Sequence, residues 1–190
     1  MVCEMSFNAE GRMIRSRFAE AVMRSQARLT YDTAAALVAD RDPHLRQEYA
    51  ALVPHLDRLH ELYQVLRTAR EQRGAMDFDT QETVIEYGSD RKIERILPTE
   101  RNDAHRLIEE CMIAANVAAA RFLQRNKVPG LYRIHEGPTE DRLNKLRAFL
   151  GELGLGLSGG EKPTPRDYTR VLELSLIHIS EPTRRTPISY

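Results

Sequence analysis

"RLIEECMIAANVAAARFL", residues 106–123, combines closely spaced alanines with two adjacent carboxylates, and it decides the middle of the fold. Apolar side chains recur in and around this stretch every three or four residues, which predicts a helix over residues 102–126. Thr99, Asn102 or Asp103 can cap its start, and Pro129-Gly130 ends it. The expected core stripe is Ala104, Leu107, Ile108, Cys111, Ala115, Ala118 and Phe122.

Polar residues form a second stripe on the same predicted helix. His105, Glu109 and Asn116 follow one another at i, i+4 and i+11, so Glu109 and Asn116 point the same way. Glu110 is turned by about 100° from Glu109, because a helix has about 3.6 residues per turn. The two carboxylates are therefore expected to have different roles.

His105 and Glu109 could act as an i, i+4 pair of metal ligands. A metal site needs further ligands, and the sequence offers none nearby. A surface His–Glu pair is the commoner meaning of this spacing, so we expect no bound metal here.

The remaining chain alternates helical and strand-like periods, which predicts a mixed α/β fold with short, mainly antiparallel strands. Before the long helix, we expect a hairpin turning at 8–11, a helix over 17–39 with a new start near Thr30, and a helix over 43–73 kinked or split at Pro54. Two or three strands over 76–96 follow, with a turn at 88–90. After the long helix, we expect a strand over 131–135, a helix over 139–153, a Gly/Pro-rich loop and a short helix over 166–172.

Composition limits the classes of partner. The 190 residues include 28 Lys plus Arg and 28 Asp plus Glu, so bulk charge favours neither nucleic acid nor membrane. No apolar run approaches the roughly 18 residues of a membrane span, and no signal peptide is evident, so we expect a cytoplasmic chain without membrane contact. Cys3 and Cys111 lack companions at zinc-ligand spacing and are expected to be reduced thiols.

The last stretch, residues 174–190, differs in character from the rest. Its apolar run stops in a Pro/Thr/Arg segment without amphipathic period, and it resembles translated sequencing-adapter read-through. We therefore expect one domain over residues 1–173 and a non-native tail over 174–190.

The common catalytic motifs identify no convincing catalytic site in the sequence. Asp77-Phe78-Asp79 could hold Mg²⁺, but a lone pair of aspartates where a helix gives way to a strand favours a turn. The glycines of residues 154–160 lack the GK[ST] ending of a phosphate loop. The chain also has no GxSxG elbow and no HExxH helix.

Aromatic and basic residues near the ends of predicted elements are more informative together. Aromatic stacking combined with arginine contacts to phosphates is how proteins hold single-stranded nucleic acid. The candidates are Arg28, Tyr31, Phe78, Arg95, Arg101, Tyr132, Arg133 and His135. Taken singly, each aromatic residue is more often part of a core.

Five blocks of sequence carry a resemblance to a known family. They are VCEMSFNAEGRMIRSRFAEAVMRSQARLTY, LRQEYAALVPHLDRLHELYQVLRTAREQRG, IERILPTERNDAHRLIEECMIAANVAAARFL, LYRIHEGPTEDRLNKLRAFLGELGL and GGEKPTPRDYTRVLE. In this order they resemble the middle of the RNB catalytic domain of the ribonuclease II family, from about Val2 to Glu173. The resemblance implies a partial RNB domain of α/β fold.

The resemblance also implies a function and three site residues. Members of this family are Mg²⁺-dependent 3′-to-5′ exoribonucleases that thread single-stranded RNA and release nucleoside monophosphates. By position, Tyr31 looks like the channel tyrosine near the ribose, Phe78 like the aromatic residue that stacks on terminal bases, and Glu109 like the acid that senses the 2′-hydroxyl. Glu110 and Asn116 are expected to be structural.

The family's catalytic residues are expected outside this stretch. Its metal-binding aspartates lie upstream of the block that resembles Val2, and its catalytic arginine lies downstream of the block that resembles Glu173, so Asp77, Asp79, Arg184 and Arg185 are not their equivalents. We therefore expect no catalytic residue and no metal ligand in this chain, and no degradation of RNA by it alone. The alternative is a standalone, non-catalytic RNA-binding or interaction module. Neither hypothesis needs an obligate protein partner.

Overall fold

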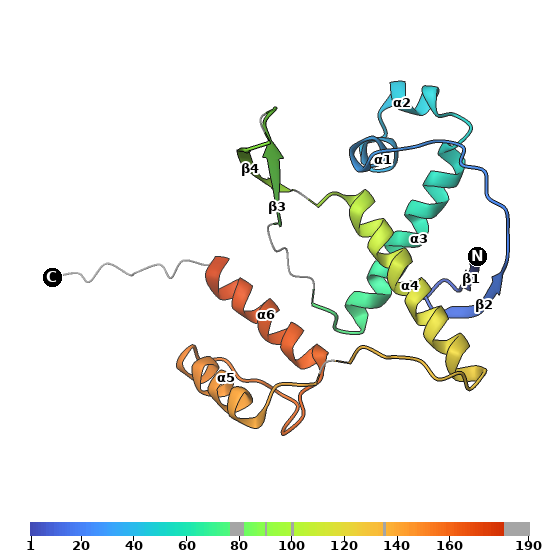
Figure 1. Cartoon of the computed structure of the whole chain (residues 1–190). Coiled ribbons are helices and arrows are strands. Elements are labelled where there is room, and N and C mark those ends of the chain that lie inside the picture. The colour runs from blue at the N-terminus through green and yellow to red at the C-terminus, as the bar shows by residue number, and fades with distance from the viewer. Residues whose placement is uncertain (77–81, 90, 100, 135, 181–190) are drawn as a thin grey trace. The chain divides into compact units, whose positions relative to one another are not determined.

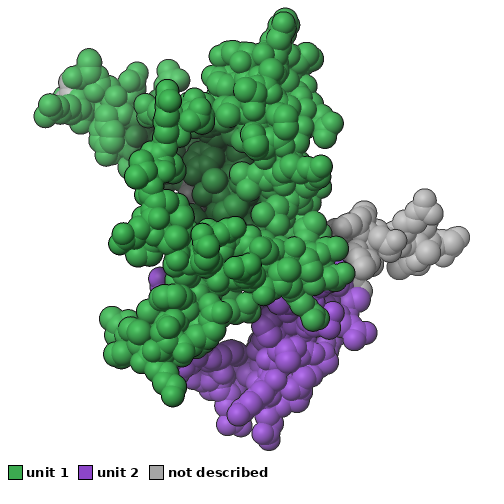
Figure 2. Space-filling model, turned by 90° about the vertical axis from the view of Figure 1, so that its right-hand side faces the viewer, with its two compact units in different colours: residues 1–69, 78–132 green, residues 70–77, 133–190 purple. Residues whose placement is uncertain are grey.

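The computed structural model describes residues 1–76, 82–89, 91–99, 101–134 and 136–180 (Figure 1). Helices and two antiparallel hairpins alternate along this part of the chain, which confirms the predicted α/β class. Two compact units are distinguished: residues 1–69 with 78–132, and residues 70–77 with 133–190 (Figure 2). None of the helices described is long and apolar enough to cross a membrane.

The first unit opens with the predicted hairpin. Strand β1 (Val2–Phe7) pairs with β2 (Met13–Ala19), with a register shift between Ser6 and Phe7. Gly11 has a φ of +71°, which only glycine adopts without strain. A Cβ on Gly11 would lie 2.8 Å from the Cβ of Ala69, so this turn also packs closely against a helix.

Helix α1 (Tyr31–Val38) begins where Thr30 caps it, as the sequence predicts, because the Thr30 hydroxyl accepts from the N–H of Thr33. The predicted helical start at Arg17 is wrong. Arg17 and Phe18 belong to β2, where Phe18 pairs with Cys3, and residues 20–30 form no regular element. Strand pairing with β1 therefore overrides the helical spacing of this segment.

The predicted split of the next helix is confirmed. Helix α2 (Pro43–Glu48) ends before α3 (Val53–Gln72) begins, and Pro54 lies in the first turn of α3. A proline there costs little, because the first N–H groups of a helix have no partner within the helix.

Arg46 joins three helices. Its guanidinium donates to both carboxylate oxygens of Asp57 on α3, at 3.0 and 2.8 Å, and to the carbonyl of Leu37 at the end of α1. The hydrogen bonds from Arg46 hold the pKa of Asp57 below its ordinary value. This contact fixes the C-terminal end of α1 relative to α2 and α3.

The second hairpin pairs β3 (Glu82–Tyr87) with β4 (Ile93–Thr99), and helix α4 (Asp103–Arg125) follows it. The buried residues of α4 are Ala104, Leu107, Glu110, Ala114 and Ala118. The predicted stripe is thus correct in part, because Ile108 and Phe122 are 39% and 40% exposed. Glu110, only 6% exposed, takes a place on the buried face, and burial raises the pKa of the neighbouring Cys111 thiol.

The second unit contains α5 (Glu140–Glu152) and α6 (Pro165–Ser180). Asp167 accepts hydrogen bonds from Ser158 and from Thr164 at the start of α6, which lowers its pKa to about 2.

The predicted strand at 131–135 is wrong, since residues 131–134 form no ladder and Leu131 is fully exposed; His135 lies outside the described residues. Helix α6 runs beyond the predicted end at residue 172, and the proposed boundary at residue 173 stays a prediction.

Candidate nucleic-acid interface

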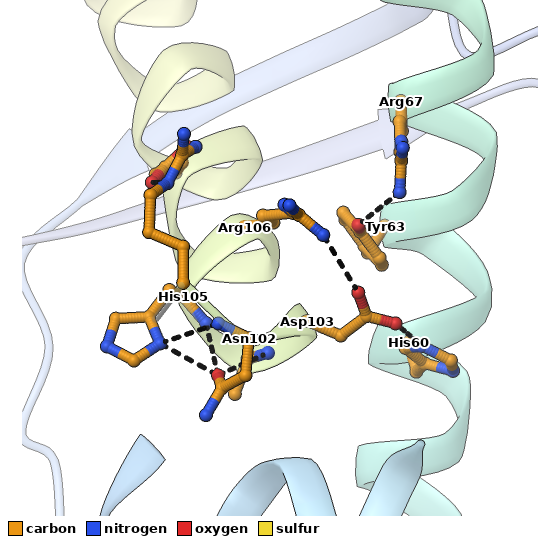
Figure 3. Close-up of polar contacts among 10 residues, drawn as sticks. His60, Tyr63, Arg67, Asn102, Asp103, His105 and Arg106 are labelled. Carbon is orange, nitrogen blue, oxygen red and sulfur yellow. Dashed lines mark hydrogen bonds and ion pairs between the residues drawn. The ribbon is translucent and has the colours of Figure 1, made fainter. Parts of the chain in front are cut away.

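The N-terminal end of α4 is organised by Asn102 (Figure 3). Its Oδ1 accepts from the backbone N–H groups of Ala104 and His105, at 3.1 and 3.2 Å. Nδ1 of His105 lies 2.8 Å from the same oxygen. The backbone N–H of Asn102 donates to the same Nδ1 at 3.4 Å, which closes a capping box between Asn102 and His105. Nδ2 of Asn102 also donates to Asp32 of α1, at 3.2 Å, so one side chain joins the starts of both helices.

Tyr31 is brought to this place by α1. Its ring stacks on the imidazole of His105, with centroids 3.9 Å apart and planes inclined by 20°. Tyr31 remains 46% exposed, so much of its ring is open to a ligand. The structure therefore places one of the three sequence-predicted site residues against α4.

Glu109 lies one helical turn after His105 and is held by Arg101. Nε of Arg101 donates to one carboxylate oxygen at 3.1 Å, and Nη2 donates to the other at 2.5 Å. The Glu109 side chain is 41% exposed, whereas that of Arg101 is 17% exposed. This two-point contact fixes the direction of the carboxylate and leaves lone pairs on its oxygens for a hydroxyl donor.

A second polar cluster, which the sequence did not reveal, connects α3 with α4 behind this surface. Asp103 lies 3.6 Å from Nε2 of His60 on α3 and 3.7 Å from Nη1 of Arg106 (Figure 3). Tyr63 of α3 stacks on His60 and accepts from Arg67. The only signal for it in the sequence was an acidic residue in the first turn of a helix, because contacts between distant segments leave no local pattern.

The described residues do not fit a Mg²⁺ site. His105 and Glu109, the hypothetical metal pair, are engaged with Asn102, Tyr31 and Arg101. In the ranges that the structure describes, no group of three or more His, Cys, Asp or Glu side chains could hold a metal ion. Asp77 and Asp79 lie outside those ranges.

The other predicted residues have separate locations. Phe78 lies outside the described residues, so its predicted role is untested. Asn116 is exposed, and Arg95 lies within β4 rather than at an end. Among the described members of the predicted RNA-binding set, Tyr31, Arg101 and Glu109 contact one another or His105 near the start of α4.

The chain is similar to ribonuclease R from several bacteria. It is 52% identical to ribonuclease R of Vibrio cholerae over 173 residues, which cover 91% of this chain and 21% of that protein. Identity to the Escherichia coli enzyme is 51% with the same coverage. The chain thus spans about a fifth of the length of these relatives.

Solved structures show the same fold. The apo form of Mycoplasma genitalium RNase R matches with a TM-score of 0.78 at 24% identity, covering 92% of this chain and 27% of that one. The same enzyme in complex with ribose-methylated single-stranded RNA matches with a TM-score of 0.76 at 23% identity, over 92% of this chain and 27% of that one. The RNB domain family model matches residues 1–188. The chain therefore belongs to the RNB domain family.

Proposed function

We propose that this chain supplies RNA-binding residues to a 3′-to-5′ exoribonuclease. The whole enzyme would bind single-stranded RNA and hydrolyse it to nucleoside monophosphates. The 52% identity of this chain to a ribonuclease R supports the reaction class. The observation that carries the proposal is that two partly exposed side chains are held at the first turns of α4, Tyr31 by stacking on His105 and Glu109 by Arg101.

In this proposal Glu109 distinguishes RNA from DNA. A carboxylate accepts a hydrogen bond from a ribose 2′-hydroxyl, and deoxyribose lacks this donor. Arg101 holds the carboxylate in one orientation, so that it meets the hydroxyl without first reorganising. Tyr31 lies beside the same sugar, with His105 supporting its ring.

Grip without sequence preference would come from aromatic faces, because every base can stack. Phe78 is the proposed stacking residue for the terminal bases. Mg²⁺ in this family would supply Lewis-acid chemistry when bound. We propose that its ligands belong to other parts of the polypeptide, and that this 190-residue chain alone binds RNA without hydrolysing it.

Fluorescence anisotropy with labelled 12-nucleotide oligo(A) and oligo(dA) tests the proposal. The wild-type chain should bind the RNA more tightly than the DNA. Glu109→Gln should reduce this preference about tenfold, which is about 1.4 kcal/mol, and leave DNA affinity unchanged. The control Glu152→Gln, an exposed carboxylate on α5, should change neither affinity.

Two results would contradict the proposal. Equal affinities of the wild-type chain for RNA and DNA would show that Glu109 does not recognise the ribose 2′-hydroxyl. Release of mononucleotides from poly(A) with Mg²⁺ by the purified chain would show that hydrolysis needs nothing further.

A further inference from the structure

A small pocket lies between β2 and the C-terminal half of α4. Its volume is about 180 Å³, and its lining includes Arg15 and Ser16 of β2 together with Arg121, Gln124 and Arg125 of α4. Phe18 and Phe122, with ring centroids 5.1 Å apart, hold β2 against α4 at this point. We call it the arginine pocket.

The charge of the arginine pocket is uniform. No acidic residue is among the described residues that line it. Within the part of the chain that the structure describes, Arg15, Arg121 and Arg125 form no ion pair, whereas Arg17 on the same strand lies 3.6 Å from Glu4. Three exposed arginines therefore line one pocket without an acidic partner among the described residues.

The position of these arginines on α4 is unusual. The buried face of α4 includes Ala114 and Ala118, and the next positions on that face, three and seven residues after Ala118, are Arg121 and Arg125. Like charges four residues apart disfavour a helix slightly. The helix dipole favours Arg125 near the C-terminal end, but it does not explain Arg121 or the approach of Arg15.

We propose that the arginine pocket binds a phosphodiester group of a nucleic-acid strand. Guanidinium groups match phosphate oxygens with paired N–H donors, and Ser16 and Gln124 add polar groups suited to the same anion. The pocket offers no aromatic face for a base, so its contact is with the backbone alone. It therefore holds RNA and DNA equally, independently of sequence.

This site is distinct from the one at the start of α4. Glu109 and Arg121 are 12 residues apart, which is about 18 Å along the axis and about 120° around it. The inference rests on the proposed function for the identity of the strand, but the two sites have opposite signatures. The Glu109 site changes the preference for RNA over DNA, whereas the arginine pocket changes affinity for both.

The test measures binding of 12-nucleotide oligo(A) and oligo(dA) to the 190-residue chain between low and moderate salt. Arg121→Gln and Arg15→Gln should each weaken both oligonucleotides by about three- to tenfold and leave their ratio unchanged. Each should also lower the slope of log affinity against log salt by about 0.7, the value for one phosphate contact on a single strand. Arg142→Gln, an exposed arginine on α5, is the matched control.

Glutamine and arginine have similar helix propensities, so α4 should be preserved, and circular dichroism checks this. Unchanged affinity and salt slope in both pocket variants would overturn the inference, and so would a loss confined to RNA. Displacement of the oligonucleotide by inorganic phosphate, at a concentration equal to that of the oligonucleotide's own phosphate groups, would assign the pocket to free phosphate and would also overturn the inference. If Glu109→Gln loses RNA preference while both pocket variants bind as the wild-type chain does, the inference fails and the proposed function stands. If the pocket variants weaken binding of both oligonucleotides while Glu109→Gln keeps the RNA preference, the proposed role of Glu109 fails and the inference stands.

Discussion

The two ends of helix α4 carry different side chains. Near the N-terminal end, the exposed carboxylate of Glu109 is held by Arg101. Near the C-terminal end, Arg121 and Arg125 continue the face that Ala114 and Ala118 bury in the middle of the helix. The first end contains an aromatic ring and a hydrogen-bond acceptor, which suit a sugar hydroxyl. The second is lined by three arginines and two polar residues beside Met13 and Ile14, and its guanidinium groups suit a phosphate. One helix can thus combine selection of the sugar with grip on the backbone, because the two tasks need opposite charges.

The largest expected effect concerns the turn of the β1–β2 hairpin, whose second strand carries Arg15. Gly11→Ala should destabilise the chain by about 2–5 kcal/mol, from about 1–2 kcal/mol for the left-handed backbone and about 1–3 kcal/mol for the clash with Ala69. Urea unfolding followed by circular dichroism measures this loss. Gly154→Ala is the control, because Gly154 also has a φ of +71° but its Cβ would meet open space. Equal losses in the two variants would show that the contact between the turn and α3 contributes nothing.

Arg101→Gln sharpens the other end of the comparison. Without its two hydrogen bonds, the Glu109 carboxylate loses its fixed direction. We expect RNA preference to fall about tenfold, equivalent to about 1.4 kcal/mol, with DNA affinity unchanged. Arg101→Lys, which retains charge but not the planar fork, should recover only part of the preference. A parallel loss of DNA affinity would instead mean that Arg101 contacts phosphate.

Asn102→Ala should cost about 1 kcal/mol of stability, the usual value for a helix cap, and should weaken the link between α1 and α4. Thermal unfolding measures the first effect, and the RNA-to-DNA ratio measures the second, since Tyr31 lies on α1. Thr139→Ala on α5 is a matched control because Thr139 makes no side-chain capping bond, so its change should be close to zero.

The smallest effect is a pH dependence. Because the pKa of Asp57 is lower in the folded chain than its ordinary value, the Arg46–Asp57 pair contributes stability above about pH 4, and this contribution is lost as the pH falls through the lowered pKa. Asp57→Asn should therefore flatten the stability curve on the acid side, as measured by urea unfolding between pH 3 and 6. Arg46→Gln should remove the same pH-dependent part. An unchanged slope in both variants would contradict the pairing.

Local patterns predicted much of the fold. The turn at Gly11, the caps at Thr30 and Asn102, the break near Pro54 and the β3–β4 hairpin all depend on residues close in sequence. The failures share a cause. Residues 17–19 had helical spacing but pair with β1, and residues 131–134 had strand-like composition but form no ladder. In the first case pairing across the β1–β2 hairpin overrode helical spacing, and in the second a strand-like composition found no partner strand among the described residues.

The candidate site was predicted only in part for the same reason. The resemblance to a family supplied Tyr31 and Glu109, and spacing placed His105 on the same face as Glu109. The stacking of Tyr31 on His105 and the hydrogen bonds from Arg101 to Glu109 depend on how α1 and the start of α4 meet. The arginine pocket was missed because Arg15 is more than 100 residues from Arg121, although the change from alanine to arginine along one face of α4 was a visible signal.

The central claim is that the two ends of α4 read different parts of a nucleic acid, and the ratio of RNA to DNA affinity in Glu109→Gln and Arg121→Gln tests it most directly. We predict that Glu109→Gln lowers the ratio about tenfold, that Arg121→Gln leaves it unchanged while both affinities fall, and that the double variant shows the sum of the two free-energy changes. An unchanged ratio in Glu109→Gln, or a changed ratio in Arg121→Gln, would contradict the account.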